Sequence, residues 1–267
     1  MYPLVRIGPF SLSSCGVLLL IAAMAGSALA GKIGRARGTG NLGHQVDNLF
    51  YPAVIGAVIG ARLWYGIFNW DLFGRTPRLF WALRVESFAW PGALLGGLLL
   101  GYLWCRWRGY DLAAVADVAA LALPVPQAIA SLGLLLSGEA FGAPTSLPWG
   151  VSLFGVVRHP TQIYLALAAL GTLIVLVQLA RRSPPPGTLM VAYLGLHGLS
   201  LVVIEWLRAD SLLLPGGFRA GQVFGLVLTL WAIWWLRQCA PQAKSDAVSG
   251  AGAPDSVQHE QGERRVW

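Results

Sequence analysis

The chain has 267 residues, of which 56% are hydrophobic and only 12% are charged, and its mean hydropathy is +0.61. A soluble domain carries roughly 25% charged residues, and a disordered chain needs low hydrophobicity, so this composition excludes both and predicts an all-α polytopic membrane protein embedded in the lipid bilayer. The net charge of +7 does not indicate nucleic-acid binding, because the basic residues stand in ones and twos between apolar runs, as is usual in membrane proteins.

Seven apolar runs are long enough to cross a membrane, which takes about 20 residues. The fourth run contains Pro124 and Pro126, and proline removes a backbone hydrogen bond, so a kink or break is expected there. Residues 1–239 should form one seven-span transmembrane domain, and the small and polar residues 240–267 a disordered cytoplasmic tail. We expect the spans at approximately 13–31, 49–69, 89–107, 112–136, 161–180, 188–207 and 220–237.

The basic residues favour one orientation of these spans. Lys32, Arg35 and Arg37 follow the first run, whereas only Arg6 precedes it, which favours an uncleaved first helix with its N-terminus outside. The expected outer loops carry acidic residues, proline and glycine as well as basic residues, which indicates that a site lies at the outer face. Alternation places two further basic pairs inside: Arg106 with Arg108, and Arg181 with Arg182.

The second span contains the small-residue motif Gly56-x3-Gly60, followed by Ala61 and Arg62. Small residues permit close packing of helices. Arg62 lies about six residues before the outer end of this span, so its side chain either snorkels to the interface or binds an anionic head group.

Two motifs flank the loop between the fourth and fifth spans. In Gly138-Glu139-x2-Gly142, a carboxylate next to glycines indicates a residue placed by a tight turn; the alternative is a solvated loop acid. The second motif, Arg-His-Pro-Thr-Gln-x-Tyr at 158–164, suits a helix start, where backbone N–H groups and the helix dipole favour anions. Its arginine and histidine predict a phosphate site; the alternative is an ordinary basic helix cap.

The sixth span carries His197 and Glu205. They are eight residues apart, roughly two helical turns, and should share a face. Glu205 and Arg208 are three residues apart and can pair. An intramembrane carboxylate is costly and indicates function, whereas a lone histidine in an apolar helix is more often a packed, hydrogen-bonded residue.

At these motifs the sequence resembles the bacterial prolipoprotein diacylglyceryl transferase family. The match covers about residues 1–237 in order, from Ile7-Gly8-Pro9 through the motifs at 60–62, 138–142, 147–151 and 158–164 to Glu205-x2-Arg208 and Gly221-Gln222. The resemblance implies a multi-pass enzyme of the bacterial inner membrane with a periplasmic-side site. Such enzymes transfer the diacylglyceryl group of phosphatidylglycerol to the lipobox cysteine thiol of a prolipoprotein, recognised through its signal peptide, and release glycerol phosphate.

The implied chemistry needs a thiolate, a phosphate clamp and a dry pocket, and neither a metal nor another cofactor. The candidate catalytic residues are Glu139, His159, His197 and Glu205, and the candidate substrate-binding residues are Arg62, Gly142, Arg158, Gln162, Tyr164 and Arg208. The sequence departs from the family pattern at Cys15, Pro91, Ser131, Leu134, His197 and Leu201, where the family has tyrosine, histidine, arginine, asparagine, tyrosine and arginine.

Three functions are therefore open at the level of sequence. The first is a transferase with a rearranged site, in which Arg62, Arg158 and Arg208 hold the phosphate and His159 or His197 accepts the thiol proton. The second is a non-catalytic relative that binds phospholipid or lipoprotein signal segments. The third is a small transporter with a proton path through intramembrane Glu205 and His197.

Overall fold

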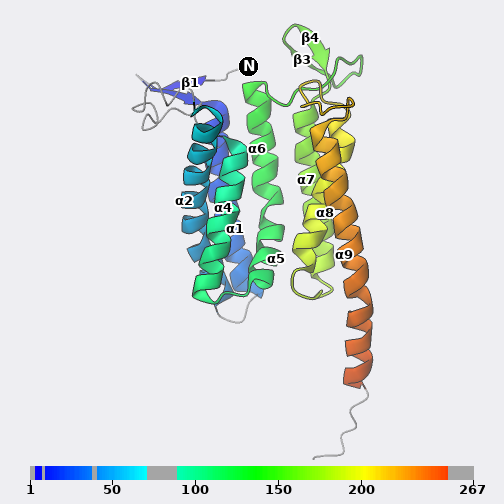
Figure 1. Ribbon diagram of the computed structural model, residues 1–267. Helices are drawn as coiled ribbons and strands as arrows, with labels where there is room; N and C mark the ends of the chain where they lie inside the picture. Colours follow the sequence, from blue (N-terminus) through cyan, green and yellow to red (C-terminus); the bar gives the residue numbers. More distant parts are fainter. Residues whose placement is uncertain (1–3, 8–9, 38–40, 71–88, 252–267) are drawn as a thin grey trace, which may run out of the picture.

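The computed structural model describes residues 4–7, 10–37, 41–70 and 89–251 (Figure 1). Two short antiparallel hairpins accompany a helical bundle: β1 (Leu4–Ile7) pairs with β2 (Phe10–Ser13), and β3 (Val151–Leu153) pairs with β4 (Val156–Arg158). The all-α polytopic class is confirmed, with these hairpins as an addition. The helices are α1 (Ser14–Arg37), α2 (Leu42–Phe68), α4 (Trp90–Arg108), α5 (Leu112–Ala122), α6 (Pro124–Ser137), α7 (Thr161–Ala180), α8 (Thr188–Glu205) and α9 (Ala220–Ala251).

The expected number of spans is not confirmed. Five of the described helices are long and apolar enough to cross a membrane, and α5 with α6 makes a sixth if the two count as one bent span. The 45° bend between them occurs where Pro124 and Pro126 predicted it. Helix α4 occupies the third expected span but is not among the five, because glycines and tryptophans interrupt its apolar residues and it ends in Arg106 and Arg108.

The helices form two groups that meet where α6 contacts α7 and α5 contacts α8 (Figure 1). In the first group α1 contacts α2, α5 and α6, and α2 packs along α4; in the second, α8 packs along α9 and contacts α7. Both hairpins lie at one end of the bundle, which we call the hairpin end, and α1, α4 and α7 finish at the opposite end (Figure 1). We call that opposite end the basic end, because each of the three helices finishes at or next to two arginines: Arg35 and Arg37, Arg106 and Arg108, Arg181 and Arg182.

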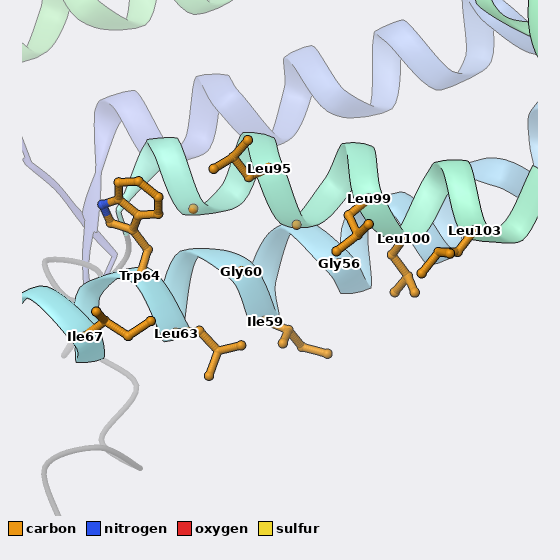
Figure 2. A pocket seen from close by; sticks show the side chains of 12 residues that line it. Gly56, Ile59, Gly60, Leu63, Trp64, Ile67, Leu95, Leu99, Leu100 and Leu103 are labelled. Atoms are coloured by element: carbon orange, nitrogen blue, oxygen red, sulfur yellow. The ribbon is translucent and has the colours of Figure 1, made fainter.

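Glycines allow α2 and α4 to pack closely. A Cβ on Gly60 would lie 2.2 Å from the carbonyl oxygen of Gly92, and one on Gly96 would lie 2.2 Å from the carbonyl oxygen of Gly56. Backbones approach so closely only where side chains are missing, so the close packing predicted from the small-residue motif is confirmed. An apolar groove of about 370 Å³ lies beside this crossing. Figure 2 shows the side chains that line it, with Trp64 near one end.

A buried carboxylate joins the two groups of helices near the basic end. Asp117 of α5 is 8% exposed; its Oδ2 accepts a hydrogen bond from the Gly187 amide at 2.9 Å and its Oδ1 accepts one from the Met190 amide at 3.0 Å. The first amides of a helix lack intrahelical partners, so Asp117 caps α8 from another helix. Asp117 was not among the residues predicted from the sequence.

Helix α9 continues past residue 239, where we expected the transmembrane domain to end, and reaches Ala251. Residues 240–251, assigned by composition to the tail, are therefore helical in the structure. Residues 252–267 lie outside the described residues, so the disorder of the tail stays a prediction.

Candidate active site

The segment that follows α6 at the hairpin end is hydrogen-bonded to two other loops. The Ala143 amide donates to the Leu207 carbonyl at 2.7 Å on one side. On the other side the Thr145 amide donates to the Val157 carbonyl at 2.9 Å, and the His159 amide donates to the Ala143 carbonyl at 3.0 Å. These bonds join three loops into one platform. We call this platform the cradle, and it comprises residues 138–145, 156–164 and 205–210.

Two glycines shape the turn that leads from α6 into the cradle. Gly138 ends α6 with φ 79°, a left-handed conformation that favours glycine. A Cβ on Gly142 would lie only 2.3 Å from the carbonyl oxygen of His159, so a side chain there would push the two loops apart. The turn places Glu139 as the flanking glycines predicted, but the Glu139 side chain is exposed.

The first turn of α7 holds this segment through two completely buried residues. The Thr161 hydroxyl donates to the Ala140 carbonyl, and Gln162 Nε2 donates to the Glu139 carbonyl at 2.7 Å. Helix α7 begins directly after Pro160, as predicted. Gln162 therefore positions the loop after α6, while its buried Oε1 has no partner among the described residues.

Arg158, at the end of β4, is the arginine of the cradle that forms no ion pair with a described residue. Its Nη1 donates to the Gly142 carbonyl at 3.3 Å, and its Nε donates to the Leu153 carbonyl at 3.4 Å. The guanidinium lies over the Phe141 ring, 5.0 Å from the ring centroid. These long bonds orient the side chain without neutralising its charge, which suits an arginine that binds phosphate.

The start of α7 contributes less to anion binding than its sequence predicted. The Thr161 amide donates to the His159 carbonyl at 2.9 Å, and the Ile163 amide donates to the Pro160 carbonyl at 2.9 Å. Amides that already donate are less available to an anion than the open helix N-terminus expected here. The Arg158 side chain is therefore the main candidate for a phosphate ligand in the cradle.

The Tyr164 hydroxyl contacts two aromatic side chains, those of Trp149 and His159. The indole Nε1 of Trp149 donates to the Tyr164 hydroxyl at 2.9 Å, and Nδ1 of His159 lies 3.5 Å from the same hydroxyl. The second distance is beyond the usual range for a strong hydrogen bond. Tyr164 therefore orients the imidazole of His159 only loosely.

Glu205, Arg208 and Asp210 form the ion pairs of the cradle. Arg208 Nη1 lies 3.1 Å from Glu205 Oε2, as the three-residue spacing predicted, and Nη2 lies 3.0 Å from Asp210 Oδ1. Burial alone would lower the pKa of Arg208, but the hydrogen bonds and charges of Asp210 and Glu205 raise it overall. Because two carboxylates neutralise Arg208, it is less available to a phosphate than Arg158 is.

Arg219 and Gly221 close this ion-pair cluster from the start of α9. Arg219 Nη1 donates to the carbonyls of Glu205 and Arg208 and to the Ser211 hydroxyl. A Cβ on Gly221 would lie 2.7 Å from the carboxyl carbon of Glu205. Arg219 was not predicted as a site residue, because its contacts depend on a loop that folds back across the end of α8.

His197 lies apart from the cradle, eight residues and about 12 Å along α8 from Glu205. Its Nδ1 is 2.9 Å from Gln127 Nε2 of α6, and the Tyr193 hydroxyl donates to Gln127 Oε1 at 3.1 Å. Because an amide nitrogen can only donate, Nδ1 accepts in this arrangement and the ring proton lies on Nε2. Glu205 contacts α9 and His197 contacts α6, so the predicted shared face does not bring them together.

Replacing Gln127 with leucine should destabilise the protein by about 1–3 kcal/mol, because Nδ1 of the half-buried His197 and the hydroxyl of the buried Tyr193 would then lose their partner. Thermal unfolding of the purified protein in detergent measures this loss. The control is Gln178→Leu, since Gln178 is an exposed glutamine on α7; it should change stability by less than about 0.5 kcal/mol. Equal losses for both variants would contradict a stabilising role for this network.

The structure brings most of the predicted site residues together. Arg62 is one of the two exceptions: it lies outside the cradle, half-buried on α2, which packs against α1, α4 and α5. His197 belongs to the interior network with Gln127 and Tyr193, which the sequence analysis missed although polar residues within an apolar run can be recognised. The predicted residues within the cradle are Glu139, Gly142, Arg158, His159, Gln162, Tyr164, Glu205 and Arg208.

Comparison with known proteins gives one consistent result. Residues 3–237 match the model of a family described as prolipoprotein diacylglyceryl transferase. A phosphatidylglycerol–prolipoprotein diacylglyceryl transferase of Clostridioides difficile is 33% identical over 212 residues, which cover 79% of this chain and 84% of the relative. The enzyme of the same name from Gloeobacter violaceus is 35% identical over 253 residues, covering 88% of this chain and 92% of the relative. One from a Synechococcus strain is 32% identical over 259 residues, with 87% and 92% covered.

Proposed function

Because this chain belongs to the prolipoprotein diacylglyceryl transferase family, we propose that it transfers a diacylglyceryl group from phosphatidylglycerol to the lipobox cysteine thiol of a prolipoprotein. The observation that carries the proposal is the match over residues 3–237, which includes the whole cradle. The protein is a multi-pass membrane protein. We assign it to the bacterial inner membrane with the hairpin end outside, where a signal peptide would present its cysteine.

In this reaction the cysteine sulfur attacks the diacylglyceryl carbon that carries the phosphate oxygen. The new carbon–sulfur bond replaces the carbon–oxygen bond, and glycerol phosphate leaves with the electron pair of the broken bond. The thiol proton passes to a base, because the thiolate is the nucleophile. Arg158 supports this step as the phosphate ligand, since its charge would stabilise the leaving group as negative charge develops there.

His159 is our candidate for the base. If its Nδ1–H is directed at the Tyr164 hydroxyl, 3.5 Å away, Nε2 keeps a lone pair that can accept the thiol proton. Bases of this kind act within hydrogen-bond reach of the proton, and such contacts often tighten when the substrate binds. The neighbouring Arg158 would bring the phosphate and the base to the same edge of the cradle.

The other candidate residues have supporting roles in this proposal. Gly142, Gln162, Glu205 and Arg208 position the three loops of the cradle through the contacts described above. Tyr164 positions His159.

Three candidates stay open as direct contacts of the substrates. The Glu139 side chain is exposed on the cradle, where it can contact a bound substrate. The Nε2–H of His197 can donate to a bound lipid. Arg62, on the other group of helices, supplies a second cation for the lipid head group.

A non-catalytic, lipid-binding role is the second candidate, and the departures from the family pattern favour it. Ser131 stands where the family has an arginine, and its hydroxyl donates to the Gln127 carbonyl at 2.9 Å. Leu201 stands at a second arginine position, and its Cβ would lie 2.9 Å from a Cβ on Gly225. Neither residue supplies a cation, so this protein would bind lipid through Arg158 without the two arginines that the family has at positions 131 and 201.

A transfer assay tests the proposal. Purified protein in lipid nanodiscs that contain phosphatidylglycerol is mixed with a synthetic lipobox peptide, and the lipidated peptide and released glycerol phosphate are measured together. We expect both products in equal amounts from the wild type. Retention of phosphatidylglycerol without either product would overturn the transferase and favour the non-catalytic relative.

Arg158→Ala should slow transfer roughly ten- to a hundredfold, because a charge-assisted hydrogen bond contributes about 1.5–3 kcal/mol and 1.4 kcal/mol corresponds to tenfold. Arg158→Lys should recover only part of the rate, since lysine keeps the charge but loses the bidentate geometry. The matched control is Lys32→Ala, an exposed cation on α1, which should transfer at the wild-type rate. If Arg158→Ala also does so, Arg158 is not the phosphate ligand.

A further inference from the structure

A second groove lies between α1 and α7, near the basic end of the bundle and far from the cradle along α7. Its volume is about 510 Å³, within the range of pockets that hold small molecules. Leu29 and Ile33 of α1 line one side, and Leu173 and Val177 of α7 line the other. Leu121 of α5, which contacts both helices, also lines the groove. The groove is thus an apolar slot where the two groups of helices are separated.

Two arginines lie where this groove reaches the basic end. Arg37 Nη2 donates to the carbonyl of Ala180, the last residue of α7, at 3.3 Å. Arg181 follows directly and also lines the groove. Both side chains are exposed, and neither forms an ion pair with another residue in the described part of the chain. The lining of the groove therefore changes from apolar side chains to two arginine side chains within the last turns of α1 and α7.

The acidic residues around the groove do not neutralise the charge of these two arginines. Asp47 pairs with Arg35 at 2.7 Å. The buried Asp117 is within the electrostatic reach of Arg37, but its two oxygens accept the amides of Gly187 and Met190. Arg37 therefore keeps most of its positive charge for a ligand that arrives from the membrane or from water.

We propose that this groove binds an anionic phospholipid from the leaflet at the basic end, with one acyl chain between α1 and α7 and the phosphate between Arg37 and Arg181. Basic pockets between transmembrane helices recognise anionic head groups in this way, and guanidinium groups match phosphate oxygens. A zwitterionic lipid offers the same chain but no net charge, and inorganic phosphate offers charge but no chain. The site is independent of the proposed transfer reaction, because it lies at the opposite end of the bundle.

Photo-cross-linking can locate the lipid directly. Full-length protein in nanodiscs is labelled with phosphatidylglycerol that carries a photoreactive group in its acyl chain, and the adducts are mapped by mass spectrometry. We expect adducts concentrated on residues 29–36 and 173–180. A phosphatidylcholine probe with the same acyl chain should label these residues about tenfold less. Equal labelling by both probes, or adducts spread over all lipid-facing helices, would overturn the proposal.

Variants distinguish binding in the groove from nonspecific attraction of anionic lipids to basic residues. Arg37→Ala combined with Arg181→Ala should reduce labelling of the groove by about tenfold or more. The control combines Lys32→Ala with Arg106→Ala, which removes the same charge from two exposed residues outside the groove and should leave labelling unchanged. If the first double variant does not fold, Val177→Trp fills the groove and keeps both arginines, and it should give the same loss. Undiminished labelling in the folded variants would refute the site.

Discussion

Glu205→Ala should lower the stability of the protein by about 3–5 kcal/mol, the usual effect of removing one partner from a buried ion pair. The side chain of Glu205 is 5% exposed, and its carboxylate lies 3.1 Å from Arg208 Nη1 and against Gly221. Alanine would leave Arg208 with only Asp210 and would open a space beside Gly221. Thermal unfolding in detergent should show the loss, together with weaker transfer activity because the cradle would lose one side.

Asp210→Ala is the matched control, because Asp210 pairs with the same arginine but is 24% exposed. Exposed pairs contribute about 0–1 kcal/mol, so this variant should stay within that range. Equal losses for Glu205→Ala and Asp210→Ala would show that burial does not govern this cluster.

Gly142→Ala should reduce transfer by about a hundredfold or more, the effect expected when catalytic groups move by about 1 Å. The added Cβ would lie 2.3 Å from the His159 carbonyl oxygen, so the loop that carries Arg158 and His159 must shift. The shift would also lengthen the bond from Arg158 Nη1 to the Gly142 carbonyl, which is already 3.3 Å long. The rate of peptide lipidation measures this effect.

Gly171→Ala is the control for a glycine-to-alanine change in this part of the chain. A Cβ on Gly171, on the exposed side of α7, would meet no atom within 4 Å. This variant should keep the wild-type rate, and its helix should be slightly more stable because alanine is the better helix former. A similar loss of activity in both variants would mean that the contact with His159 is not the cause.

Features that depend on neighbouring residues could be predicted from the sequence. The bend at Pro124, the start of α7 after Pro160 and the pairing of Glu205 with Arg208 each follow from a few adjacent positions. The small-residue motif at Gly56 and Gly60 predicted close packing, but not that its partners would be glycines of α4. The β3–β4 hairpin was not predicted. In the structure Phe154 and Gly155 both have positive φ, which is typical of a two-residue hairpin turn.

Features that depend on contacts between distant segments could not be predicted. Gln127 and His197 are polar residues in two separate apolar runs, and only the packing of α6 against the second group of helices joins them. Asp117 stands alone in the sequence, and its role as a cap becomes visible only when the start of α8 lies beside it. The site prediction was nearest to the structure where motifs from adjacent loops carried it, around Arg158 and Gly142.

The cradle also sets the order in which this protein can mature during synthesis. Residues 138–145 of the cradle are hydrogen-bonded on one side to β4 and the residue after it, and on the other side to Leu207 and Ala209, which follow α8. A nascent chain that has been translated only through α7 lacks that second side, so the cradle cannot be complete until the ribosome has passed α8. The cradle would thus be completed late, after most of the helices have already entered the bilayer.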